Sequence, residues 1–182
     1  MDIVALCLEL GASKAEEIPV SKLVFQPELR ALCEQNHCGQ YGRNYTCPPH
    51  VGEVNALIAR LKAFRTAVIW QNIHPLEDSF DFEGMMAAKQ KHTRMTQEIA
   101  GRVYATLGHE RALVLSAGGC GLCDPCAIQA QASCRHPDEA LSSLEAYGIN
   151  VSKIGEVSGL RYINGANTVT YFAGAFLRDT NP

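Results

Sequence analysis

The sequence lacks the usual features of a membrane, secreted or nucleic-acid-binding protein. No apolar run is long enough to span a bilayer. The first residues include Asp2 and Glu9 and lack the basic start of a secretory signal. Basic residues are not in excess, since the chain has 16 lysines and arginines against 19 aspartates and glutamates. These absences predict a cytoplasmic protein with no nucleic acid and no membrane among its partners.

Charged residues are also few and scattered. They make up 19% of the chain, and only Lys89, Lys91 and Arg94 gather, on one predicted helix. A short basic group of this kind is expected to be a solvated face and not a phosphate site. There is no Ser–His–Asp arrangement, phosphate-binding loop or dinucleotide fingerprint, so no motif of this kind indicates a reaction.

Hydrophobic residues and cysteine, by contrast, are plentiful. The hydrophobic share is 47%, and 182 residues are enough for one domain (residues 1–182) around one core. Eight cysteines in a reducing compartment are more typical of metal ligands or redox groups than of disulfides. A disulfide scaffold is the alternative, but a chain that can build a core does not need such cross-links.

The spacing of apolar residues predicts alternating helices and strands. Helical spacing covers residues 2–10, 27–36, 53–64, 85–107 and 137–148. Strands are predicted at 66–73, 112–117 and 167–177, with one or two short edge strands within 17–25. Residues 37–52, dense in glycine, proline and asparagine, are expected to form a loop. The pattern indicates an α/β fold, in which helices pack on a central mixed β-sheet that carries two cysteine-rich metal-binding loops.

The most specific motif directly follows the predicted strand at 112–117. In GGCGLCDPCAIQAQASC the spacing is C-x2-C-x2-C-x7-C, formed by Cys120, Cys123, Cys126 and Cys134. Two residues between thiols let the chain curl around one centre, and the glycines permit the turns. Three close thiols with a fourth at a distance are typical of a 4Fe–4S cluster, whereas structural zinc usually takes its ligands in two pairs. A 4Fe–4S cluster is therefore the predicted cofactor, with zinc, or free or disulfide-linked thiols, as alternatives.

A second cysteine group is looser. Cys33, Cys38 and Cys47 are spaced C-x4-C-x8-C, which matches no standard zinc finger. These thiols could hold a second cluster with one iron open to substrate, or they could add ligands to the first site. A fourth ligand could come from one of three residues: His37, His50 or Cys7. The alternative is that the three cysteines are buried as small hydrophobic side chains.

Three further residues have more than one interpretation. Arg43 would either place positive charge near a thiolate centre, where it would raise the reduction potential or hold an anionic substrate, or be an exposed loop arginine. Cys7 lies on an amphipathic helix and is expected in the core. His136 is expected to orient a neighbouring group or to stand at the start of a helix, rather than to bind metal itself.

Three motifs resemble a known family. They are YGRNYTCPPH, GGCGLCDPC followed by CRHPDEALSSLEAYGI, and the closing TVTYFAGAFL. In these motifs the chain resembles a bacterial and archaeal family of cysteine-rich predicted metal-binding proteins, a domain of unknown function. The resemblance implies iron–sulfur or other metal binding by six motif cysteines: Cys38, Cys47, Cys120, Cys123, Cys126 and Cys134. Cys33 matches the family less firmly. The resemblance to this family implies no reaction.

The function expected from these residues is that of an iron–sulfur protein. One or two 4Fe–4S clusters would move electrons to or from a redox partner protein, or assist a reductive reaction. A second hypothesis is an enzyme that acts on a small-molecule substrate through an open-site cluster held by three cysteines. A third is a zinc-binding structural or metal-delivery module. The residues leave open whether the protein is an enzyme.

Overall fold

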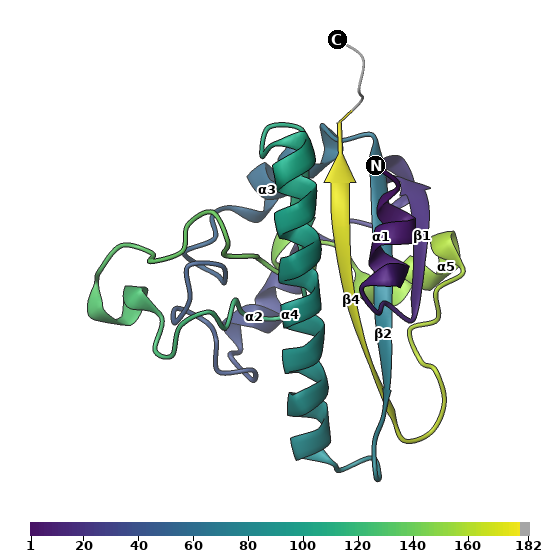
Figure 1. Cartoon of the computed structure of the whole chain (residues 1–182). Helices are drawn as coiled ribbons and strands as arrows, with labels where there is room; N and C mark the ends of the chain where they lie inside the picture. The colour runs from purple at the N-terminus through teal and green to yellow at the C-terminus, as the bar shows by residue number, and fades with distance from the viewer. Residues whose placement is uncertain (179–182) are drawn as a thin grey trace.

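A four-stranded antiparallel sheet forms the centre of the fold (Figure 1). The structure is a computed structural model that describes residues 1–178. The strands are β1 (Lys14–Pro19), β2 (Thr66–Pro75), β3 (Ala112–Leu115) and β4 (Thr168–Leu177). Their order in the sheet is β1-β2-β4-β3. The α/β class is confirmed. The sheet was expected to be mixed, but neighbouring strands are antiparallel throughout, and the parallel pairing within residues 1–178 is one isolated bridge between Ser116 and Ser143.

The two central strands are long, and each contains an unbroken run of buried residues. All 10 residues of β2 pair with β4, from Thr66 opposite Leu177 to Pro75 opposite Thr168. Residues 67–72 are buried without interruption because both faces of the sheet are covered, which explains why this strand does not alternate between apolar and polar residues. β1 lies at an edge, as predicted, and an edge strand tolerates its terminal Pro19.

Helices cover both faces of the sheet. On one face, α1 (Ile3–Glu9) and α4 (Phe82–Leu107) pack on Trp70 and its neighbours. The other face, around Ile69 and Phe176, is covered by α3 (Val54–Lys62), α5 (Ile154–Ser158) and the segment between β3 and α5. The short α2 (Arg30–Glu34) follows a 3-10 turn at Pro27–Leu29, so the predicted helix at 27–36 exists in a shortened form. None of the helices within residues 1–178 has both the length and the apolar character needed to cross a membrane.

The predicted helix at 137–148 is wrong. Only a 3-10 turn, Glu145–Tyr147, forms there. The segment runs instead beside the end of β3, where Ser116 N donates to Ser142 O at 2.8 Å and Leu144 N donates to Ser116 O at 3.1 Å. Its apolar residues are buried as the pattern requires, but backbone pairing with Ser116 replaces helical hydrogen bonds.

Candidate metal centre

Seven of the eight cysteines lie either in two irregular segments or near the end of α2. Loop A (residues 35–53) contains Cys38 and Cys47, and Cys33 lies just before it on α2. Loop B (residues 116–144) contains the other four. Figure 1 shows both loops beyond α4, on the same side of the sheet, although residues 54–115 separate them in the chain. The predicted loop at 37–52 is confirmed.

Hydrogen bonds hold loop A against loop B. Arg43 Nη2 donates to Gln129 Oε1, and Gln129 Nε2 donates to Arg43 O, both at 3.3 Å. Tyr45 Oη donates to Ala132 O at 2.8 Å. Arg43 is exposed, as the alternative of a loop arginine expects, and its backbone and its guanidinium also both bond to loop B.

The two loops also pack closely against each other at Gly119. A Cβ atom added to Gly119 would lie 3.3 Å from Asn44 Nδ2 and 3.5 Å from Cys47 Sγ. The next residue, Cys120, donates its N–H to Thr46 Oγ1 at 3.2 Å. Thr46 and Asn44 are both buried, so this junction is packed and not merely adjacent. The Cys47 thiol therefore lies against the start of the cysteine run of loop B.

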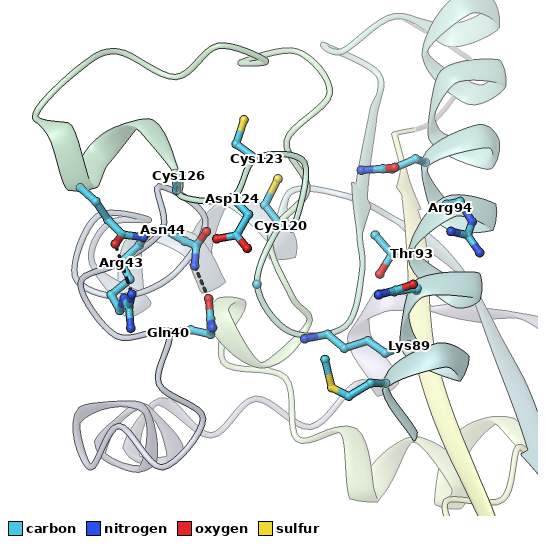
Figure 2. Close-up of a pocket in the computed structure, with 16 residues that line it drawn as sticks. Gln40, Arg43, Asn44, Lys89, Thr93, Arg94, Cys120, Cys123, Asp124 and Cys126 are labelled. Atoms are coloured by element: carbon cyan, nitrogen blue, oxygen red, sulfur yellow. Dashed lines mark hydrogen bonds between the residues drawn. The ribbon is translucent and has the colours of Figure 1, made fainter. Parts of the chain in front are cut away.

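The four cysteines of loop B line one recess. This recess is also bounded by Thr46 of loop A and by His136, and its cysteines are Cys120, Cys123, Cys126 and Cys134. Burial raises the pKa of the Cys120 thiol, and the neighbouring thiols of Cys134 and Cys123 raise it further. In Figure 2 the sulfur atoms of Cys120 and Cys123 point in the same direction from loop B. The structure thus brings all four thiols of the run to one space.

Cys33, Cys38 and Cys47 form a second group. Burial raises the pKa of Cys47 to about 11, with further contributions from Cys38 and Cys33. Burial also raises the pKa of Cys33; the guanidinium of Arg30 acts against this increase, and the Cys38 thiol adds to it. These three thiols are close enough to influence one another electrostatically, and Cys38 is the exposed member.

The candidate fourth ligands lie in different surroundings. Cys7 is a fully buried residue of α1, where burial raises its pKa to about 12, so the expectation of a core residue is confirmed. His37 is exposed and pairs with Gln35 at 3.2 Å. The ring of His50, also exposed, lies 6.2 Å from that of Tyr45.

The donor chemistry of the recess fits a thiophilic metal. All eight cysteines are free thiols, which does not support the disulfide alternative. Across residues 1–178, no three cysteine, histidine, aspartate or glutamate side chains already lie at the spacing that holds a metal ion. Gly118 and Gly121, at φ 69° and 72°, flank the first cysteine of loop B and permit the turns around it.

A larger cavity of about 550 Å³ lies between the cysteine loops and α4 (Figure 2). Lys89 and Arg94 line it from α4, together with Thr93, while Arg43 lines it from loop A. Lys91 and Arg94 are exposed and Lys89 is half-buried, which agrees with the expected solvated face, but Lys89 and Arg94 also line this cavity, whereas Lys91 does not.

A sequence signal for this cavity exists. The residues of α4 that line it recur every three or four positions, which places them on one face of the helix. They are Met86, Lys89, Gln90, Thr93, Arg94 and Gln97. A mostly polar stripe opposite the apolar stripe of a long helix is ordinarily solvated, and only the position of the loops shows that this one is partly covered.

The fold and the site together define a cysteine-rich α/β domain, whose clustered thiols are donors that zinc and iron–sulfur centres use. The sequence model of a family described as "predicted metal-binding protein (DUF2284)" matches residues 16–177, and the chain belongs to this family. The match includes the four cysteines of loop B and the three of the second group. No curated protein and no solved structure matches the chain.

Proposed function

We propose that the protein binds a 4Fe–4S cluster in loop B and uses it for electron transfer or a reductive reaction. The ligands are the four thiols of the C-x2-C-x2-C-x7-C run: Cys120, Cys123, Cys126 and Cys134. The observation that supports this proposal is the single recess that all four thiols line. A cluster bound by four thiolates supplies one-electron transfer without losing a ligand, and the partner is then a redox protein or a reducible small molecule.

The surrounding residues favour a metal centre in two ways. Burial raises the pKa of the Cys120 and Cys47 thiols, which favours their protonated forms when no metal is bound. Metal binding therefore releases protons and gains affinity as the pH rises. The Lys89 ammonium lowers the pKa of Cys47 and so favours its thiolate, although burial outweighs it. Positive charge near thiolate ligands offsets the charge of the centre they form.

A second candidate function is enzymatic, and the cavity beside the cysteines favours it. Cys33, Cys38 and Cys47 would hold a second cluster that has one iron without a protein ligand and is therefore open to a small molecule. The contact between Cys47 and Gly119 also favours a different arrangement, in which Cys47 adds to the site in loop B.

Metal analysis after oxygen-free purification tests the proposal. Iron and acid-labile sulfide at about four each per chain indicate one 4Fe–4S cluster, and about eight each indicate two. A colourless protein with stoichiometric zinc and no iron would overturn the iron proposal in favour of a zinc-binding module. A protein that binds neither metal would overturn both.

A pair of cysteine variants tests the ligand assignment. Cys123→Ala should lower the metal content and also the stability, because metal binding contributes to folding free energy where the site is not preformed. Cys7→Ala is the matched control, since Cys7 lies in the hydrophobic core and should leave the metal content unchanged. The opposite result, with metal lost only in Cys7→Ala, would refute the assignment.

A further inference from the structure

We propose that the cavity between α4 and the cysteine loops binds a small organic or inorganic polyanion that carries carboxylate or phosphate groups. This ligand would lie beside the metal centre and would be its substrate or effector. The inference deepens the proposed function. Only the ligand's role as substrate or effector rests on the proposed function, because the protein's own side chains form the cavity whether or not a metal centre is present.

Three cationic residues line the cavity from two sides. Lys89 and Arg94 belong to α4, and Arg43 belongs to loop A. In Figure 2 the Lys89 side chain extends from α4 toward loop B. Within residues 1–178, the ion pairs involve other residues, so none of these three cations has a carboxylate partner. Asp124 is the one carboxylate among the lining residues. Three cations against one carboxylate leave a positive cavity, which attracts anions and disfavours cations.

Neutral hydrogen-bonding groups complete the lining. Amide and hydroxyl side chains are contributed by both sides of the cavity: Gln40, Asn44, Gln90, Thr93 and Gln97. Gln40 and Asn44 bond to each other on the loop side. Amides and hydroxyls can donate to carboxylate or phosphate oxygens, and the volume of about 550 Å³ lies within the range of small-molecule sites, roughly 300–1,000 Å³.

The cavity adjoins the cysteines directly. Cys120, Cys123 and Cys126 line it as well as the recess described above. Lys89 reaches across from α4, because a Cβ atom added to Gly118 would lie 3.1 Å from Lys89 Nζ. An anion paired with Lys89 therefore lies next to the first cysteine of loop B, where a metal centre could act on it.

The competing explanation is that the cations only balance the negative charge of metal-bound thiolates. The two explanations differ in what a charge-removing variant should lose. If the cations bind an external anion, removing them weakens anion binding and leaves the metal content unchanged. If they only balance the thiolates, removing them lowers the metal content, and no external anion binds.

The experiment is calorimetric titration of the metal-loaded protein, without oxygen and at constant ionic strength, with citrate and with inorganic pyrophosphate. At least one of the two anions should bind with 1:1 stoichiometry. The double variant Lys89→Gln/Arg94→Gln should bind it about tenfold more weakly or worse, because two charge-assisted hydrogen bonds are lost. Lys91→Gln is the matched control, since Lys91 is a cation on the same helix outside the cavity.

The outcomes separate this inference from the proposed function. It is overturned if neither anion binds, if Lys91→Gln weakens binding as much as the double variant, or if the double variant loses metal and keeps its anion affinity. A protein that binds no iron would refute the proposed function only, because the same titration on that protein still tests the cavity. Arg43 is left unchanged in these variants because its bonds to Gln129 hold the loops together.

Discussion

Mild acid should destabilise the fold through His92. This residue is fully buried between α4 and the sheet. Its Nδ1 donates to Asn72 Oδ1 at 2.7 Å, and its ring stacks on Tyr171 with 5.7 Å between centroids. Burial lowers the pKa of His92 from 6.5 to about 4, so the folded state keeps the imidazole neutral where an unfolded chain protonates it.

The sign and size of the effect follow from proton linkage. Between pH 6.5 and about 4 the unfolded state binds one more proton at His92 than the folded state, so the free energy of unfolding falls as the pH falls through this window. Each pH unit costs at most about 1.4 kcal/mol, which gives a total loss of roughly 3 kcal/mol. Above pH 7 the residue is neutral in both states and adds no pH dependence.

Urea denaturation at a series of pH values between 7.5 and 4 measures this loss, on metal-free protein so that acid release of metal does not contribute. His92→Asn retains a donor near Nδ1 and cannot gain charge, so its stability should fall by roughly 3 kcal/mol less than that of the wild type. His74, whose pKa burial also lowers, is present in both proteins and cancels in the comparison. His109→Asn removes an exposed histidine and should follow the wild type. Equal pH dependence of His92→Asn and the wild type would refute the reasoning.

Two further predictions concern the junction of the loops. Tyr45→Phe removes the hydrogen bond to Ala132 O, which should lower the free energy of unfolding by about 1 kcal/mol and speed metal loss to a chelator. Tyr162→Phe, at an exposed tyrosine, should change neither quantity. Unchanged release from Tyr45→Phe would show that this bond does not hold the site. Gly119→Ala pushes a methyl group against Asn44 Nδ2, 3.3 Å away, and should lower the metal content. Gly101→Ala, on α4 with open space around it, should keep the metal and raise the free energy of unfolding by up to about 1 kcal/mol. Equal metal content in the two glycine variants would contradict the packed junction.

The local elements could be predicted from the sequence, whereas their arrangement could not. The apolar spacing places the helix that ends at Gly108 and the strand that contains Trp70, because both patterns are local. Nothing in the alternation of the last strand shows that it lies between β2 and β3. The helix prediction at 137–148 was wrong for the same reason, because it used only local spacing. The spacing of Leu141 and Leu144 fits a helix, but it also fits an extended segment whose backbone pairs with Ser116.

The site divides in the same way. Cysteine spacing was enough to predict that Cys120, Cys123, Cys126 and Cys134 share a space, because the turns between them are short. The contact of the two loops depends on bonds such as that from Tyr45 to Ala132, 87 residues away, which no local pattern encodes. The cavity depends further on the distance between these loops and the polar face of α4.

Loop B begins and ends at the same place. Its two ends meet where Ser116 pairs with Ser142 and Leu144, so the intervening residues leave the sheet and return to it at one point. The entropic cost of lengthening such a closed segment grows only slowly with its length. The cysteine-bearing segment can therefore change in length between its cysteines at little entropic cost while its two ends stay paired to the end of β3.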